Sequence, residues 1–550
     1  MLTVPERLEV AAGRGHDVTF VVGGGEDVVP WALLHQEARA LAAGLQARGV
    51  RPGDHVALLG STSRELVTAV QAVWLAGAAV VVLPLPMRLA SLEDFVAQTR
   101  RRILDAGAAV VVVDPELAPF LGRPEPGDLP IVGFAELVGE PGSWRRPAPD
   151  PERTAILQFT SGSTSDPKGV VLPDRAVGAN LDAIAAAARL DVDEDVLVSW
   201  LPLYHDMGLV GILANAMAAG CRLVLGAPSD FMASPGRWME WISTYGGTAT
   251  AGPNFSYVLA TRALRRGGEP LDLSRLRIAL NGAEPVDPAT VAAFVEAGAR
   301  HGLRPGAVFP AFGMAEVAIA GTFPEPLAGL RVDRVDRRVL EAERYAAPVP
   351  EGAEGARELA ILGRPVPGLE IRVCDPVSGD VLRDREVGEL EIRGTSVTTG
   401  YHARPDATAE LFHDGWLRTG DLAYLVEGEM VMCGRIKDLI IVGGRNVFPE
   451  DVERALAGVE GVRAGNVIAF GVEGDRGKEG LVVVAETRAD DPPSVRRLVA
   501  ERVRAAVGLP AKDVVLVPAG SLPKTSSGKL QRSLCKTLYL DQELETLLPA

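Results

Sequence analysis

The run QFTSGSTSDPKGVV, residues 158–171, is the most informative stretch of this chain. Between Thr160 and Ser165, five hydroxyl side chains surround one glycine, and Lys168 follows shortly after. Small residues let backbone N–H groups approach a polyphosphate, hydroxyls add hydrogen bonds, and a lysine adds a point charge. The run directly follows the apolar stretch TAILQF, 154–159, as a phosphate-binding turn follows a strand. We therefore predict a phosphate-binding loop.

Two other loop types are excluded at this run. A Walker A loop needs glycine immediately before the lysine, and Pro167 stands there. The G-x-S-x-G pattern of a serine nucleophile elbow does not occur in it. The plain alternative is a solvated Ser/Thr/Gly linker, which would leave Lys168 and the preceding strand unexplained.

The surrounding pattern predicts an α/β protein. In the first half, helical stretches alternate with short apolar runs such as 79–84 and 107–114, which is typical of βαβ units with parallel sheets covered on both faces. From about 360 to 432, short strands separated by turns indicate an antiparallel unit. We expect a large N-terminal domain of two α/β subdomains plus a small β-barrel-like subdomain, and a small α+β C-terminal domain. The predicted boundaries are 1–432 for the N-terminal domain, 433–438 for a hinge and 439–550 for a mobile C-terminal domain.

Composition excludes several partners. The 550 residues carry a formal net charge of −16, which argues against binding to nucleic acid or to an anionic membrane. The uncharged stretch 66–87 is long enough to span a bilayer, but it contains Pro84 and Pro86 and changes from a helical to a strand pattern. We interpret it as a buried helix and strand. Four scattered cysteines and an N-terminus without the apolar segment of a signal peptide predict a cytoplasmic protein.

Four more motifs follow the loop in a fixed order. They are FGMAE at 312–316, WLRTGDL at 416–422, GRIKDLI at 434–440 and LPKTSSGKLQR at 522–532. With the loop, they resemble the adenylate-forming superfamily of acyl- and aryl-CoA synthetases, luciferases and adenylation domains. Only seven of the 56 basic residues are lysine, and four of those seven lie in these motifs: Lys168, Lys437, Lys524 and Lys529. Acyl adenylation brings a carboxylate against an anionic phosphate, so it needs positive charge at that point.

The resemblance implies roles for individual residues. Phe312 would stack on adenine, Asp421 and Arg435 would hold the ribose, and Glu316 would bind Mg²⁺. Lys529 would contact the carboxylate and the α-phosphate, and is the first catalytic candidate. Lys437 would stand at the hinge. The implied ATP-binding residues are Thr160, Ser161, Gly162, Ser163, Thr164, Lys168, Asn281, Gly282, Ala283, Glu284, Phe312, Gly313, Met314, Asp421 and Arg435.

Further runs indicate one branch of the superfamily. WLPLYHDMGL at 200–209, AGPNFSYVLA at 251–260, RIALNGAEPV at 277–286 and GGRNVFPEDVE at 443–453 together resemble the fatty acyl-AMP ligases. In that branch His205 lies beside the acyl and phosphate groups, so it is the second catalytic candidate. The residues expected to bind the acyl substrate are Trp200, Met207, Gly252 and Phe255. The alternatives are that His205 is a satisfied core histidine and that Met207 and the nearby aromatic residues are simple core.

The branch implies a reaction in two steps. A fatty acid would be activated with ATP to an acyl-adenylate, with release of pyrophosphate. The acyl group would then pass to the phosphopantetheine thiol of an acyl carrier protein supplied in trans, because the chain ends 21 residues after Lys529. The family attributes the rejection of free CoA to an insertion, for which 330–357 is the candidate; an exposed loop without this role is the alternative. Two other functions stay open: a fatty acyl-CoA synthetase and a catalytically inactive nucleotide-binding scaffold.

Overall fold

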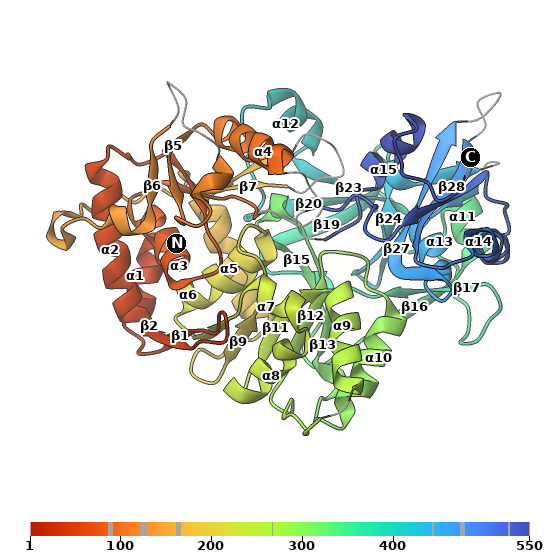
Figure 1. The fold of residues 1–550 in the computed structure, drawn as a ribbon, viewed down its shortest axis with the longest axis horizontal. Coiled ribbons are helices and arrows are strands. Elements are labelled where there is room, and N and C mark those ends of the chain that lie inside the picture. Colours follow the sequence, from red (N-terminus) through yellow and green to blue (C-terminus); the bar gives the residue numbers. More distant parts are fainter. Residues whose placement is uncertain are drawn as a thin grey trace.

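The computed structural model describes residues 2–85, 92–121, 129–160, 167–266, 268–442, 445–473, 479–525 and 528–548. Its large N-terminal part holds two mixed α/β units and a β-rich unit, and a smaller α+β part follows at the C-terminal end (Figure 1). The predicted fold class is therefore confirmed.

The first α/β unit is built on a seven-stranded sheet in the order β21-β8-β7-β4-β3-β5-β6. Its strands are β3 (His55–Leu59), β4 (Ala79–Val82), β5 (Ala108–Val113), β6 (Ile131–Gly133), β7 (Thr154–Phe159), β8 (Gly169–Pro173) and β21 (Gly400–Tyr401). The pairs within β6, β5, β3, β4 and β7 are parallel, whereas β8 runs antiparallel to β7. The apolar runs at 79–84, 107–114 and 154–159 thus form strands, as predicted.

Helices cover this sheet on both faces. They include α2 (Trp31–Ala47), α3 (Arg64–Leu75) and α4 (Leu92–Asp105). Helix α3 is buried along its whole length from Leu66 to Leu75, and the Ser63 side chain caps its start by accepting from the Leu66 N–H. The uncharged stretch is therefore a buried helix followed by strand β4. Among the described residues, no helix is long and apolar enough to cross a membrane.

The second α/β unit has a seven-stranded sheet in the order β13-β12-β11-β9-β10-β1-β2. Its strands are β1 (Asp17–Phe20), β2 (Asp27–Pro30), β9 (Val196–Ser199), β10 (Arg222–Leu225), β11 (Ala249–Pro253), β12 (Ile278–Gly282) and β13 (Val308–Pro310). Its helices are α1 (Val4–Ala12), α5 (Asp174–Ala187), α6 (Asn215–Ala219), α7 (Pro228–Ala233), α8 (Gly236–Tyr245), α9 (Asn254–Arg265) and α10 (Pro288–Ala299). The N-terminal hairpin β1–β2 joins this sheet through β10, where Val18 pairs with Leu223, a long-range pairing that the sequence did not predict.

Parallel pairing brings the carboxyl ends of neighbouring strands to the same edge of the sheet. Strands β9, β11 and β12 are parallel neighbours, and Gly252 pairs with Asn281 near their carboxyl ends. Residues that follow these strands therefore meet at one edge, where α/β sheets bind ligands.

The β-rich unit is antiparallel, as predicted. Strand β20 pairs with β19 and β23, and β23 pairs with β22 and β24. These strands are β19 (Leu369–Cys374), β20 (Gly388–Gly394), β22 (Phe412–His413), β23 (Trp416–Val426) and β24 (Glu429–Arg435), and α12 (Pro405–Leu411) packs beside them. A small three-stranded sheet holds β14 (Phe312–Gly313), β15 (Ala320–Phe323) and β18 (Arg364–Pro365).

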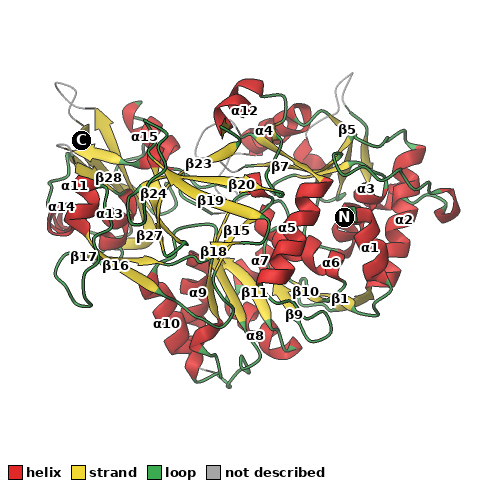
Figure 2. Ribbon diagram, turned by 180° about the vertical axis from the view of Figure 1, so that it is seen from behind, coloured by secondary structure: helices red, strands yellow, loops and turns green. Residues whose placement is uncertain are grey.

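The charged segment 330–357 contributes regular structure. Strand β16 (Val332–Asp336) leads into helix α11 (Arg337–Glu343), and β16 pairs antiparallel with β17 (Ala356–Ala360). Both views place α11 beside α13 and α14 of the C-terminal part (Figures 1 and 2).

The C-terminal part has its own apolar core, contributed mainly by valines of β27, β28 and α14. Its elements are β25 (Ile440–Val442), β26 (Arg445–Val447), α13 (Pro449–Leu456), β27 (Val462–Glu473), β28 (Glu479–Thr487), α14 (Pro492–Val507), β29 (Asp513–Pro518) and α15 (Arg532–Leu540). A separate core is what a small domain needs in order to move as a unit.

Replacing two glycines that lie within helices should change the stability of the protein in opposite directions. A Cβ on Gly44 in α2 would overlap the backbone carbonyl of Leu137, so Gly44→Ala should destabilise the protein by about 1–3 kcal/mol. A Cβ on Gly178 in α5 would lie 3.5 Å from the Arg7 side chain, an ordinary contact, so Gly178→Ala should stabilise by about 0.5–1 kcal/mol. Calorimetric unfolding of both variants tests this. An unchanged or raised melting temperature for Gly44→Ala would contradict the described packing of α2.

Candidate active site

The turn after β12 lies against the start of α9. Asn281 is fully buried, and its side-chain amide donates to Asn254 Oδ1 at 3.0 Å, while its own Oδ1 has no partner in the described part of the chain. After Gly282, Ala283 adopts a left-handed φ of +67°. Glu284 then accepts a hydrogen bond from the Phe255 N–H at 2.6 Å, in the first turn of α9. A carboxylate is favoured at that helix end, and the bond holds the turn in place.

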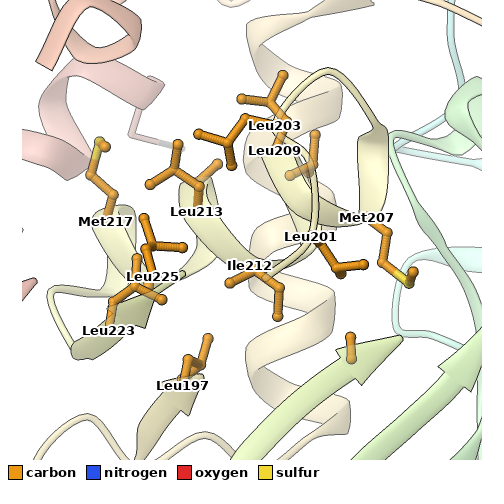
Figure 3. Close-up of a cluster of buried hydrophobic side chains, with 14 of the residues drawn as sticks. Leu197, Leu201, Leu203, Met207, Leu209, Ile212, Leu213, Met217, Leu223 and Leu225 are labelled. Carbon is orange, nitrogen blue, oxygen red and sulfur yellow. The ribbon is translucent and has the colours of Figure 1, made fainter. Parts of the chain in front are cut away.

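The YHDMG run leads into a π-helix, η4 (Met207–Ala214). Asp206 caps it by accepting from the Met207 N–H at 2.9 Å. π-helical turns are frequent at functional sites. Figure 3 shows Met207 at the end of the apolar cluster farthest from Met217.

His205 immediately precedes this cap. Its Nε2 is buried without a hydrogen-bond partner among the described residues. A core histidine with both ring nitrogens hydrogen-bonded, the alternative interpretation, does not match this unpaired nitrogen. Burial, together with the Lys529 ammonium, lowers the pKa of His205 to about 3, so the imidazole is neutral near pH 7.

Lys529, from the C-terminal part, lies within electrostatic range of His205. Burial lowers the pKa of Lys529, and the carboxylates of Asp206 and Glu284 act in the opposite direction. The pKa of both carboxyls is raised by burial, and Lys529 opposes that shift in each. Asp206, which the sequence analysis did not single out, thus interacts electrostatically with Lys529, as Glu284 does. Its position next to His205 was the available signal.

Glu316 is buried, with 8 % of its surface exposed, in the short helix Ala315–Val317. The Tyr401 hydroxyl donates to Glu316 Oε1 at 2.8 Å, and Lys168 Nζ lies 4.7 Å from the centroid of the Tyr401 ring. Burial raises the pKa of Glu316, although the Tyr401 bond opposes the shift. Tyr401 therefore connects two predicted site residues. Nothing in its spacing indicates this, because the link arises only when β21 pairs with β8.

The predicted ribose pair is in register on neighbouring strands. Asp421 of β23 pairs with Arg435 of β24, and Arg435 Nε lies 3.0 Å from Asp421 Oδ1. Asp421 is 1 % exposed, so this ion pair holds a buried carboxylate at the end of β23. Burial raises the pKa of Asp421, with Arg435 opposing. Lys437 follows in the turn Ile436–Asp438, and burial lowers its pKa.

The structure describes only the two ends of the predicted phosphate-binding loop. Ser161, Gly162, Ser163 and Thr164 lie outside the described residues. The two ends of the loop are described: the Thr160 N–H donates to the Lys168 carbonyl at 3.0 Å, which closes the loop between β7 and β8.

The predicted acyl-binding residues include part of a packed aromatic cluster. The Trp200 ring is stacked on Phe231, with ring centroids 3.7 Å apart, and it meets Trp238 and Phe255 edge-on. A Cβ on Gly252 would come within 2.9 Å of Trp238, so glycine is needed there. Contact with an acyl chain stays a prediction for Trp200, Gly252, Phe255 and Met207.

The aromatic-Gly motif is held by a tight loop. Phe312 is 7 % exposed, and a Cβ on Gly313 would overlap the Ile319 carbonyl. The Met314 N–H donates to that same carbonyl at 2.9 Å. Stacking of Phe312 on a base stays a prediction.

The donor set fits a nucleotide with a hard cation. Asn281 Oδ1 is a buried acceptor that an amino group of a ligand would satisfy, and the buried Asp421 carboxylate would accept from ligand hydroxyl groups. No group of three or more His, Cys, Asp or Glu side chains able to hold a metal occurs among the described residues. One carboxylate such as Glu316, supplemented by phosphate oxygens, is the usual way in which proteins hold Mg²⁺.

Comparisons with known proteins define the class. A model of the AMP-binding enzyme family matches residues 8–402. A putative ligase of Mycobacterium tuberculosis is 41 % identical over 526 residues, covering 92 % of this chain and 94 % of that protein. The chain belongs to the AMP-binding enzyme family.

Within the family, similarity extends to the branch expected from the motifs. The long-chain-fatty-acid–AMP ligase FadD26 of Mycobacterium bovis is 32 % identical over 576 residues, covering 98 % of this chain and 97 % of that protein. A solved structure from a study of fatty acyl-adenylate ligases from E. coli and L. pneumophila matches with a TM-score of 0.92 and 31 % identity, covering 98 % of both chains. The resemblance to fatty acyl-AMP ligases is confirmed.

The low pKa of His205 gives a testable pH dependence. Because its folded pKa of about 3 lies below the reference value of 6.5, the unfolded chain binds the extra proton between these values, and His205 reduces stability as pH falls through that interval. NMR titration, with the signal assigned by His205→Gln, should show a neutral ring down to about pH 5. Lys529→Ala should raise the pKa, yet leave it below 6.5 because burial is the larger cause. A midpoint near 6.5 in the intact protein would contradict the site.

Proposed function

We propose that this protein activates a fatty acid with ATP to an acyl-adenylate, releases pyrophosphate, and transfers the acyl group to the phosphopantetheine thiol of a carrier protein. The observation that carries the proposal is that Lys529 lies within electrostatic range of Asp206, Glu284 and a neutral His205. A cation delivered by the C-terminal part to the carboxyl edge of the sheet suits a reaction between two anions.

The nucleotide would be held by residues from both units of the N-terminal part. Asp421, with Arg435 behind it, would accept from the ribose hydroxyls, and Asn281 Oδ1 would accept from the adenine amino group. Lys168 and the loop beginning at Thr160 would face the phosphates. Mg²⁺, when bound, would neutralise charge on the pyrophosphate leaving group. Glu316, held by Tyr401, would be its protein ligand.

The attacking group is the substrate carboxylate. One of its oxygens would form the bond to the α-phosphorus while the bond to pyrophosphate breaks, and no proton needs to be removed. Lys529 would stabilise the charge that builds up on the α-phosphate. His205 Nε2, which lacks a partner among the described residues, would form a hydrogen bond to the reacting groups. The acyl chain would extend past Trp200 and Met207.

The second step would require the C-terminal part to rotate about Lys437, which would withdraw Lys529 and admit the thiol. The thiol sulfur would then bond to the acyl carbon while the bond to AMP breaks, AMP would leave, and the thiol proton would pass to solvent. Contacts of the segment 330–357 oppose such a rotation. Glu341 of α11 forms an ion pair with Arg445, and its backbone carbonyl accepts from the Asn446 side chain at 2.9 Å. The Arg337 guanidinium donates to the Ala506 carbonyl at the end of α14.

Arg357 of β17, at the end of the segment, adds a buried contact. Its Nε lies 2.9 Å from Asp451 Oδ1 in α13, its Nη2 donates to the Cys433 carbonyl at 2.9 Å, and its guanidinium lies 4.2 Å from the Phe448 ring centroid. Only 4 % of its side chain is exposed. Removing one partner of a buried pair costs about 3–5 kcal/mol, so these contacts support a restraining role over that of an exposed loop.

The reaction is tested by mass spectrometry of the products. With ATP, Mg²⁺ and fatty acids of graded length, the enzyme should form acyl-adenylate and pyrophosphate. Acyl-adenylate should persist when CoA is added and be consumed when a phosphopantetheinylated carrier protein is added. Rapid conversion to acyl-CoA would assign the protein to the acyl-CoA synthetases, and no adenylate with any acid would favour a nucleotide-binding scaffold.

Removal of Lys529 should abolish the first step selectively. Lys529→Ala is expected to lower the rate of acyl-adenylate formation by at least about 10²-fold, since it removes a charge that acts in the transition state. ATP binding, measured by calorimetry, should be retained. A retained rate of adenylation would disprove the role of Lys529.

The restraint by 330–357 has its own test. In Glu341→Ala/Arg445→Ala both partners are removed, so no buried charge is left alone, and acyl-CoA formation should rise several-fold as rotation becomes easier. The control is Arg334→Ala/Glu358→Ala, which removes a pair between β16 and β17 that does not involve the C-terminal part. Equal CoA activity in both double variants would refute the restraint.

A further inference from the structure

Lys524 is a motif lysine without a role in the proposed chemistry. It lies in the same run as Lys529 and is half-buried, which is costly for an ammonium unless it is paired. Its Nζ donates to Asn466 Oδ1 at 2.6 Å. Asn466 is itself buried and donates to the Ala464 carbonyl at 3.1 Å, inside the bulge of β27 where the pairing with β28 shifts register. Lys524 thus bonds to a fixed point of the C-terminal sheet.

A second contact holds the same segment. The Leu522 N–H donates to Glu486 Oε1 at 3.1 Å, and Glu486 is fully buried on β28. The other carboxylate oxygen of Glu486 accepts from Arg463 Nη1 at 2.6 Å, also in the bulge. Burial and Arg463 lower the pKa of Lys524, and Glu486 raises it. Among the described residues, Lys524 thus bonds to one amide and lies within electrostatic range of one carboxylate and one guanidinium.

The segment then returns to Lys529 as a narrow hairpin. Lys524 and Leu530 form an antiparallel bridge, and the Gln531 N–H donates to the Pro523 carbonyl at 2.9 Å. The Thr525 N–H donates to the Lys529 carbonyl at 2.8 Å, while Thr525 Oγ1 accepts from the Lys529 N–H at 3.1 Å. The backbone of Lys529 is thus fixed to the strand that carries Lys524.

We infer that Lys524, through Asn466, is a positioning residue that sets where Lys529 enters the active site. Without the Lys524–Asn466 bond the hairpin keeps its internal bonds. The strand that carries Lys524 is then attached to the sheet through Leu522 and Glu486, while Arg532, which donates to the Ala469 carbonyl at 2.9 Å, holds the residues after Lys529. A small misplacement of a group that acts in the transition state lowers the rate strongly, whereas a step in which Lys529 takes no part is unaffected. This inference rests on the proposed function.

The test separates the two half-reactions. Lys524→Met should lower kcat for acyl-adenylate formation by about 10²-fold with little change in the KM for the acid. Transfer from acyl-adenylate supplied ready-made to a carrier thiol should proceed at the wild-type rate. Lys524→Arg, which keeps a donor, should recover much of the loss. In the Lys529→Ala background, Lys524→Met should cause no further loss, because the two residues act as one unit.

Two variants serve as controls. Lys512→Met removes an exposed lysine of the same domain, whose Nζ donates to the Glu473 carbonyl at 3.4 Å, and should leave both half-reactions unchanged. Asn466→Ala removes the same bond from its other partner. It should cause the same selective loss of acyl-adenylate formation, and it replaces Lys524→Met in the test if that variant does not fold. Equal losses in both half-reactions, or a loss in Lys524→Met that adds fully to that of Lys529→Ala, would overturn the positioning role. A wild-type enzyme without adenylation would instead refute the proposed function.

Discussion

The charge of Lys529 at the junction of the two parts is the interaction on which the site depends. The ammonium lies within electrostatic range of the carboxylates of Asp206 and Glu284, which favour its charged form. Asp206 caps η4, and Glu284 holds the first turn of α9, so each carboxylate is also fixed by the backbone of its own unit. The lysine comes from the C-terminal part and the carboxylates from the N-terminal sheet edge. Lys529 and the two carboxylates therefore come together only when the two parts are docked.

The docked arrangement is stabilised away from the pocket. Arg357 and α11 hold the C-terminal part, and Arg454, one helical turn after the Asp451 that binds Arg357, lies 3.5 Å from Asp287, the cap of α10. Several of these groups are buried charges with atoms that lack a partner among the described residues, including Glu450 Oε2 and Asp451 Oδ2. Such an interface fits one geometry well and tolerates displacement poorly. That property suits an enzyme that retains an activated intermediate.

Local pattern predicted much of the fold, and long-range pairing accounts for the rest. The strands β4, β5 and β7 and the buried helix α3 follow from apolar runs whose length and turn residues are local properties. The β1–β2 hairpin could not be predicted, because its partner β10 lies far along the chain. The site shows the same division. The motifs identified Glu316 and Lys168. Tyr401 contacts both, but it reaches them only because the two-residue strand β21 pairs with β8. Likewise, the sequence identifies 330–357 as the candidate insertion, whereas its contacts with α13 and α14 depend on the docked arrangement.

The central claim is that the docked arrangement performs adenylation and must open for transfer. It is tested most directly by crosslinking Asp287→Cys to Arg454→Cys with a short bismaleimide, since this pair joins the two parts and the four native cysteines are buried. The account predicts that the crosslinked enzyme forms one equivalent of acyl-adenylate with pyrophosphate and fails to pass it to a carrier thiol, whereas the uncrosslinked variant does both. A crosslinked enzyme that forms no adenylate, or that transfers at the uncrosslinked rate, would contradict the account.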